Sequence, residues 1–194
     1  MAEVVLYHHI QGLTEGVRSF ANELRAAGHT VHTPDLFDGR TFATMDEAFA
    51  VVREAGEALD ANADRAAHAL PEELVYAGIS WGVGAAQRHV QTRAGARGAL
   101  LYEACLPVTG ENAFGPWPND LPVQIHGKAD DQFFTHEGDI DAARELVATI
   151  GPDRAELFVY PGNEHLFIDS SLPTYDADAA GLVTQRTLHF LSVL

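Results

Sequence analysis

Short apolar runs alternate along the whole chain with segments in which apolar residues recur every three or four positions. Runs of the first kind predict buried strands, and segments of the second kind predict amphipathic helices. We expect strands at residues 4–7, 30–33, 74–78, 98–102, 123–126 and 157–160. Because strands that alternate with helices form βαβ units, the pattern predicts an α/β fold, with a mostly parallel sheet of about six strands flanked by helices on both faces.

Capping residues predict where several helices begin and end. Thr44 and Glu47 have the spacing of a capping box, so we expect a helix to begin there and to run toward Leu70. Asp139 can cap a helix that Gly151 ends. Other helices are expected at residues 17–28, 80–93 and 176–194. In open α/β sheets ligands bind at the carboxyl ends of the strands, so the residues just after each strand are the candidates for chemistry.

Length and hydrophobic content are typical of one domain spanning residues 1–194. Of these residues 46% are hydrophobic, which is enough to form a substantial core. The longest apolar runs, such as residues 98–102, are too short to cross a bilayer, and the N-terminus lacks the basic and apolar segments of a signal peptide. We therefore expect a cytoplasmic protein.

Charge and cysteine content narrow the function classes. The formal net charge of -16 repels phosphate backbones and anionic membranes, so we expect neither a nucleic acid nor a membrane as a partner. A single cysteine, Cys105, can form neither an internal disulfide nor a thiolate metal site. A small molecule is the expected partner, and a homodimer is left open.

The pentapeptide GISWG at residues 78–82 follows a predicted strand and precedes a predicted helix. This is the context of the G-x-S-x-G nucleophile elbow. A turn this tight forces its central residue into a strained backbone geometry, and glycines on both sides leave room for it. Ser80 is therefore expected at the edge of the sheet, at a helix N-terminus that favours negative charge. The alternative is a glycine-rich turn with an incidental serine.

A nucleophilic serine needs a histidine as its base and an acid that orients the histidine. His165 and Asp130 each follow a predicted strand, and the chain order Ser, Asp, His is the one found in α/β-hydrolases. Asp131 would be the acid if its strand ended one residue later, and Glu103 follows another predicted strand as a further rival. The Gly-x-x-Asp pattern just after the strand favours Asp130. We therefore expect a triad of Ser80, Asp130 and His165.

Four stretches together resemble the dienelactone hydrolase family over nearly the whole chain: PDLF at residues 34–37, the elbow at Ser80, HGKAD at 126–130 and YPGNEHLF at 160–167. The resemblance implies an α/β-hydrolase fold of one domain without a lid domain. It also implies hydrolysis of esters and lactones without a cofactor. By position, it places the nucleophile on Ser80, the acid on Asp130 and the histidine on His165.

Three positions depart from the family pattern. The best-known dienelactone hydrolases carry a cysteine at the position of Ser80, a glutamate at that of His9, and an arginine that holds the substrate carboxylate at that of Asp169. Because an aspartate offers a carboxylate only acceptors and like charge, we expect neutral esters or lactones to be preferred over an anionic dienelactone. In the alternative, Asp169 faces solvent or caps a turn.

Two backbone amides are expected to form an oxyanion hole. In this fold one donor belongs to the residue after the nucleophile, here Trp81. The family pattern places the other at Ile10, in a loop that Gly12 allows to turn closely. The residues expected to contact the substrate are His9, Phe37 and Glu103.

These residues together predict a serine hydrolase that cleaves a carboxylic ester or lactone of a small molecule through an acyl-enzyme. The alternatives are an acyltransferase or thioester hydrolase on the same triad, and a non-catalytic small-molecule-binding homologue. Ten histidines, including the adjacent His8 and His9, raise the question of a metal site with His126 and His165. No pair has the i, i+4 spacing of ligands on a helix, so we expect no metal.

Overall fold

A computed structural model describes residues 1–111 and 113–194 of the chain, and its centre is a six-stranded sheet. All strands are parallel, in the order β2-β1-β3-β4-β5-β6. The strands are β1 (Glu3–Tyr7), β2 (Thr30–His32), β3 (Leu74–Ile79), β4 (Ala96–Tyr102), β5 (Val123–Lys128) and β6 (Ala155–Tyr160). The predicted α/β fold with a parallel sheet is therefore confirmed.

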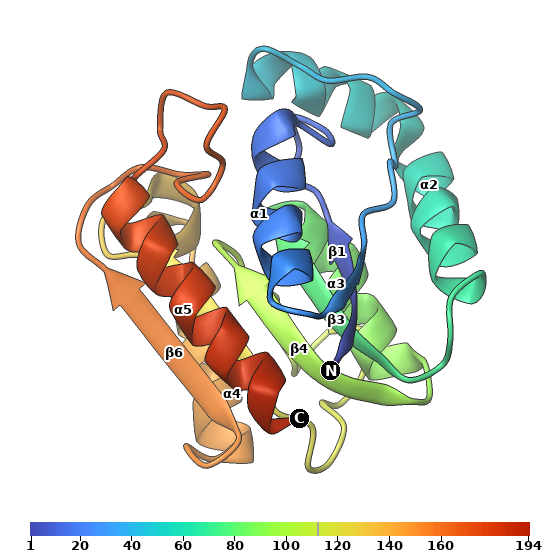
Figure 1. Cartoon of the computed structure of the whole chain (residues 1–194), viewed down its shortest axis with the longest axis vertical. Helices are drawn as coiled ribbons and strands as arrows, with labels where there is room; N and C mark the ends of the chain where they lie inside the picture. The colour runs from blue at the N-terminus through green and yellow to red at the C-terminus, as the bar shows by residue number, and fades with distance from the viewer. Residues whose placement is uncertain (112) are drawn as a thin grey trace.

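Helices cover both faces of the sheet (Figure 1). They are α1 (Glu15–Ala26), α2 (Met45–His68), α3 (Gly82–Thr92), α4 (Asp139–Ile150) and α5 (Ala177–Val193), together with a short π-helix, η1 (Gln132–His136). Helices α1 and α5 pack on one face, and α2, α3 and α4 pack on the other. Within the described residues there is no separate lid domain, and no helix is long and apolar enough to cross a membrane.

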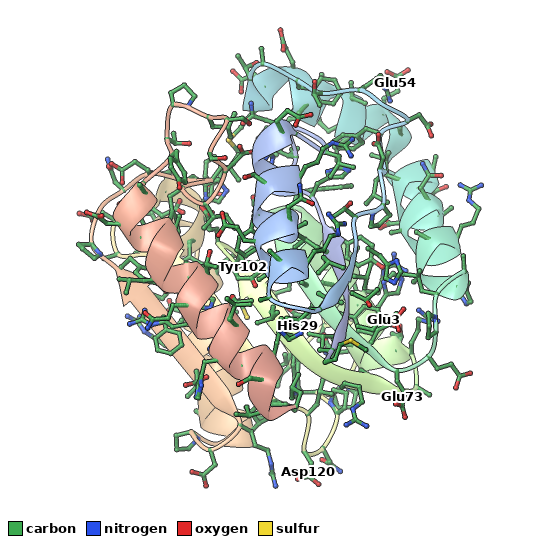
Figure 2. All side chains as sticks on the ribbon, in the orientation of Figure 1. Glu3, His29, Glu54, Glu73, Tyr102 and Asp120 are labelled. Atoms are coloured by element: carbon green, nitrogen blue, oxygen red, sulfur yellow. The ribbon has the colours of Figure 1, made fainter. Side chains whose placement is uncertain are left out.

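The two faces of the sheet carry two separate apolar clusters. Tyr102 of β4 shows how tightly the second one is packed: its ring meets Phe20 of α1 edge to face, and its hydroxyl lies 2.9 Å from the Thr187 hydroxyl of α5. The tyrosine lies between these two helices, whereas the acidic Glu54 and Glu73 stand at the rim of the molecule (Figure 2). Both glutamates are exposed and lie outside this closely packed cluster.

Side-chain caps mark the starts of two helices at the positions that the sequence predicts. The Thr44 side chain accepts a hydrogen bond from the Glu47 amide at 3.3 Å, so α2 begins at the predicted capping box. Asp176 caps α5 by accepting from the Ala179 amide. The end of β5 differs from the prediction, because pairing with β6 continues two residues further, to Lys128. The π-helix that follows was not predicted either.

The strand order reverses next to β1, which lies between β2 and β3. At such a switch point, the loops after neighbouring strands leave toward opposite faces and open a crevice at the carboxyl ends. The loop after β1 and the turn after β3 both lie at this edge of the sheet. The crevice thus lies at the position where Ser80 and Ile10 were predicted to meet a substrate.

Candidate active site

Ser80 occupies a strained turn between β3 and α3. Its φ is 49°, in the left-handed region that residues with a side chain rarely adopt. The flanking glycines are required by space: a Cβ on Gly78 would lie 2.4 Å from the Gly82 carbonyl oxygen, and one on Gly82 would lie 2.5 Å from the carbonyl oxygens of Tyr7 and His8. The geometry is therefore that of a nucleophile elbow, with the hydroxyl presented at the start of α3.

Ser80, His165 and Asp131 form a chain of two short hydrogen bonds. The Ser80 hydroxyl lies 2.7 Å from Nε2 of His165, and Nδ1 of the same ring lies 2.7 Å from Oδ2 of Asp131. With the Nδ1 proton donated to the carboxylate, Nε2 is free to accept the serine proton. This is the arrangement in which an imidazole serves as a general base.

Asp130, the residue predicted as the acid, does not reach His165. Its side chain is 77% exposed and lies 3.6 Å from Nε2 of His136. The partner of His165 is Asp131 instead because β5 is longer than predicted. The longer strand shifts the turn along the chain and brings Asp131 inward, where it is fully buried. Asp131 is the alternative acid that the sequence allows if the strand ends later.

The second carboxylate oxygen of Asp131 caps the π-helix. Oδ1 accepts hydrogen bonds from the Phe133 amide at 2.8 Å and the Phe134 amide at 3.3 Å, while Oδ2 meets His165. Both oxygens are thus occupied, and the carboxylate cannot rotate away from the imidazole without losing the cap. The start of the π-helix therefore holds the Asp131 carboxylate against His165.

A cavity of about 290 Å³ opens over the Ser80 hydroxyl. Its walls are formed by Ile10, Met45, Phe49, Ser80, Trp81, Val83, Gly84, Glu103, Ala104, Leu106, Phe133, Glu137, Asp139 and His165. The walls are mostly apolar, and three of these side chains carry carboxyl groups. A larger cavity of about 450 Å³ lies at the amino ends of the strands, but neither Ser80 nor His165 lines it.

The two amides predicted for the oxyanion hole border this cavity. Among the described residues, neither the Ile10 amide nor the Trp81 amide donates a hydrogen bond to another protein group. Trp81 directly precedes α3, so its amide belongs to the positive end of the helix. Both donors are therefore available to a negatively charged oxygen at Ser80.

The model of the dienelactone hydrolase family matches residues 1–194. The chain belongs to the dienelactone hydrolase family. No curated protein matches the sequence significantly.

Solved structures of family members and esterases share the fold. A candidate dienelactone hydrolase from Klebsiella pneumoniae has a TM-score of 0.75 at 19% identity, covering 100% of this chain and 88% of that one. A dienelactone hydrolase-like promiscuous phosphotriesterase from metagenomic libraries has a TM-score of 0.72 at 17% identity, covering 100% and 87%. A thermophilic esterase from Thermogutta terrifontis, with bound propionate, has a TM-score of 0.64 at 16% identity, covering 99% and 83%.

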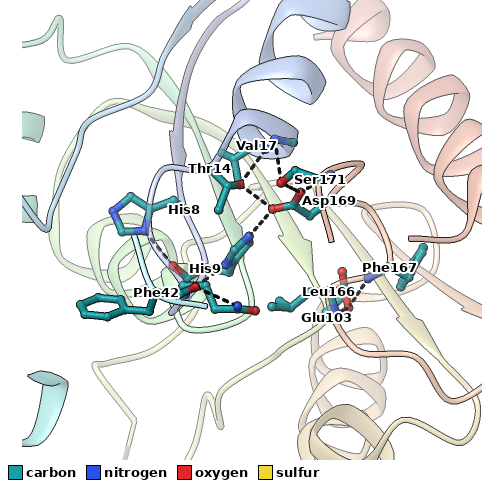
Figure 3. Close-up of polar contacts among 12 residues, drawn as sticks. His8, His9, Thr14, Val17, Phe42, Glu103, Leu166, Phe167, Asp169 and Ser171 are labelled. Atoms are coloured by element: carbon teal, nitrogen blue, oxygen red, sulfur yellow. Dashed lines mark hydrogen bonds and ion pairs between the residues drawn. The ribbon is translucent and has the colours of Figure 1, made fainter. Parts of the chain in front are cut away.

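Two buried histidines hold the loop after β1 that carries Ile10, the predicted oxyanion-hole donor (Figure 3). His8 bonds through Nδ1 to the His9 carbonyl oxygen at 2.8 Å, and its Nε2 accepts from the Leu36 amide at 3.1 Å. Burial lowers the pKa of His8 to about 4, so the ring is neutral near pH 7, as the accepting Nε2 requires. His9 accepts from the Gln11 amide at 3.2 Å. The loop that carries Ile10 is therefore fixed on both sides.

Asp169 does not face the cavity, contrary to the interpretation on which the predicted substrate preference rested. It is buried and bonds His9 Nε2 at 2.7 Å, the Thr14 hydroxyl, and the amide and hydroxyl of Ser171 (Figure 3). Burial alone would raise the pKa of Asp169, but the hydrogen bonds from His9, Ser171 and Thr14 lower it to about 2. Part of the alternative is correct, because the bond to the Ser171 amide closes a turn.

Of the three predicted substrate contacts, only one lines the cavity. His9 is held in the pair with Asp169, and Phe37 is buried in the cluster formed with α2 and α3, so neither borders the space over Ser80. Glu103 does border it. Met45 and Phe49 of α2 line it instead, which only the position of this helix over the crevice could have revealed.

The charges around His165 favour its protonated form. Burial lowers the pKa of the imidazole, but the hydrogen bond to Asp131 and the negative charges of Glu103, Asp131 and Asp139 outweigh it and raise the pKa above the ordinary histidine value. Stabilising the imidazolium is what a general base requires once it has taken the serine proton.

In the described residues, one group of side chains is close enough to be considered for a metal ion: Glu103, Asp131 and His165, whose ligand atoms lie within 4.8 Å of one another. Both ring nitrogens of His165 already have partners, so a metal ion bound to this ring would break its hydrogen bond to either Ser80 or Asp131. Of the other predicted candidates, His126 bonds Tyr160 and Gln124, and does not join this group.

Proposed function

We propose that this protein is a serine hydrolase that cleaves a carboxylic ester or lactone of a small molecule through an acyl-enzyme, with Ser80 as nucleophile, His165 as base and Asp131 as acid. The observation that carries the proposal is the unbroken hydrogen-bond chain from Ser80 through His165 to Asp131, at 2.7 Å for each step. The family assignment supports the reaction class.

In the proposed reaction, Ser80 Oγ attacks the carbonyl carbon while His165 Nε2 takes the hydroxyl proton. The negative charge that develops on the carbonyl oxygen meets the amides of Ile10 and Trp81, each worth on the order of 3 kcal/mol in such sites. His165 then returns the proton to the leaving alcohol, and a water molecule cleaves the acyl-enzyme by the same route. Throughout, Asp131 holds the ring and stabilises the imidazolium.

Two alternatives use the same cavity. An acyltransferase or thioester hydrolase would pass through the same acyl-enzyme, and the apolar walls do not distinguish the leaving groups. A non-catalytic binder needs a cavity but not a serine in a strained turn, and such strain is retained where it serves chemistry. The φ of Ser80, at 49°, therefore favours an enzyme.

The proposed function is tested by the Ser80→Ala variant in an assay with a p-nitrophenyl ester of a short acid. Without the hydroxyl, we expect kcat to fall by about 10⁴-fold or more, with unchanged circular dichroism. Ser19→Ala, an exposed position on α1, is the matched control and is expected to keep full activity. Esterase activity of Ser80→Ala above a few per cent, in a folded protein, would contradict the proposal.

A further inference from the structure

Glu103 is a buried carboxyl group that the proposed reaction does not use. It follows β4 directly, has a fully buried side chain, and lines the cavity beside His165. Its φ is 64°, a left-handed conformation that costs free energy for a residue with a side chain. A strained, buried acid needs a compensating role.

One oxygen of Glu103 holds the loop that carries His165. Oε2 accepts hydrogen bonds from the Leu166 amide and, at 3.3 Å, from the Phe167 amide (Figure 3). Leu166 is itself left-handed, with a φ of 62°. The two hydrogen bonds from a carboxyl group on a different strand thus help to hold Leu166, the residue just after the base, in this unfavourable conformation.

The same oxygen lies 3.7 Å from Nδ1 of His165, beyond the bond that Asp131 makes. The other oxygen, Oε1, is buried and has no hydrogen-bond partner among the described residues. Leaving a buried oxygen unpaired is costly, so the contacts of Oε2 have to offset that cost.

We propose that Glu103 is a positioning residue: by accepting from the Leu166 and Phe167 amides it holds the loop so that the His165 imidazole spans Asp131 and Ser80. The inference rests on the proposed function and deepens it. Asp131 orients the ring through its side chain, whereas Glu103 orients it through the backbone that follows.

The charge of Glu103 adds a property that can be measured. Burial raises its pKa to about 7, and as a carboxylate it favours the imidazolium form of His165. The titratable groups that act on His165 are Asp131 after β5, Glu103 after β4 and Asp139 at the start of α4. Removing one negative charge lowers the pKa of the base, so the acidic limb of the pH profile of kcat/KM moves to lower pH.

Two variants of Glu103 separate its role as a hydrogen-bond acceptor from the effect of its negative charge. Glu103→Gln keeps an oxygen for the two amides but has no charge, so kcat should stay within about 10-fold of the wild type while the acidic limb moves to lower pH. Glu103→Met keeps the length but has no acceptor, so kcat should fall by about 10²-fold with little change in KM, the size of loss expected from a displaced catalytic group.

A buried polar residue away from the cavity supplies the control. Gln124 is buried on β5 and bonds Glu156 and His126, so Gln124→Met removes hydrogen bonds without touching the site. It should leave kcat and the pH profile unchanged when the variants are compared at equal distance below their melting temperatures. This isolates a loss of positioning from a loss of stability.

The outcomes decide the inference. A wild-type kcat and pH profile in Glu103→Met would overturn it. An equal loss of kcat in Glu103→Gln and Glu103→Met would also overturn it, because the loss would then come from the missing charge and not from the missing acceptor. If Glu103→Met does not fold, Glu103→Asp decides, because it keeps the charge but shortens the side chain by one methylene and so withdraws the acceptor from the two amides. A fall in kcat of about 10-fold or more in Glu103→Asp supports the inference, and a wild-type kcat overturns it. Ser80→Ala is assayed alongside; if it stays active, the proposed function fails, not merely the role of Glu103.

Discussion

Two loops at the same end of the sheet each carry a buried histidine paired with a buried aspartate. After β6, His165 lies 2.7 Å from Asp131, and after β1, His9 lies 2.7 Å from Asp169. The difference is at the other ring nitrogen. That of His165 meets the Ser80 hydroxyl, whereas that of His9 accepts from the Gln11 amide.

The comparison teaches that a histidine–aspartate pair is not by itself a catalytic feature. His165 borders the cavity, and its free nitrogen faces a hydroxyl whose proton it can take. The other nitrogen of His9 bonds the Gln11 amide instead of a hydroxyl, and the pair with Asp169 closes the loop that carries Ile10. The same histidine–aspartate pair is thus a base in the proposed mechanism in one loop and a structural support in the other.

The largest expected difference between the two pairs is in kcat. His165→Gln removes the base and should lower kcat by about 10⁴-fold or more. His9→Gln keeps a donor for Asp169 and should lower kcat by less than about 10²-fold, through a small displacement of the Ile10 amide. Steady-state kinetics of the two variants, at matched stability, measure both values. Equal losses would mean that the two histidines share one role.

The next largest effect separates the neighbouring Asp130 and Asp131. Asp131→Asn keeps the shape but can fix the His165 ring in the wrong tautomer, a loss that reaches about 10⁴-fold in a serine-protease triad. Asp130→Asn changes an exposed side chain and should leave kcat within about two-fold of the wild type. If Asp130→Asn proves the more damaging change, the loop after β5 must rearrange in the active enzyme.

Most of the fold could be predicted from the sequence, because the strands are apolar runs and helix caps such as Thr44 and Asp176 act locally. The elbow at Ser80 could be predicted for the same reason: strand, tight turn and helix are all adjacent in the chain. His165 was found by its position after a strand. These predictions depend on contacts between residues close together in sequence.

The remaining features depend on contacts that are distant in sequence or on a strand end. A shift of two residues in the end of β5 exchanged Asp130 for Asp131 as the partner of His165. The pair of His9 and Asp169 joins residues 160 positions apart, and no local pattern indicates it. Phe37 is buried rather than exposed to substrate because its ring packs against His8, Phe42 and Trp81, which depends on tertiary packing.

The smallest expected effect concerns substrate charge, and it now rests on the cavity rather than on Asp169. Glu103, Glu137 and Asp139 line the space over Ser80, and no lysine or arginine is among its lining residues in the described chain. A neutral short-chain ester should therefore have a kcat/KM several-fold to about 10-fold higher than an anionic ester of similar size. Kinetics on the matched pair, at low and high salt, check this.

Asp139→Asn sharpens that prediction. An asparagine can still accept from the Cys105 amide, which Asp139 bonds at 3.1 Å, but it removes one negative charge from the wall. The difference in kcat/KM between the neutral and anionic esters should therefore become smaller. A wild-type preference for the anionic ester would mean that a cation outside the cavity wall binds the substrate.

The central claim is that Ser80 is an activated nucleophile, and covalent labelling tests it most directly. The wild-type protein is treated with a fluorophosphonate, digested, and mapped by mass spectrometry. We expect a single adduct on the peptide that contains Ser80, formed in proportion to the loss of esterase activity. In His165→Gln the same adduct should form far more slowly, because the serine then lacks its base. An unlabelled Ser80 in an inactivated protein, or full labelling with activity retained, would contradict it.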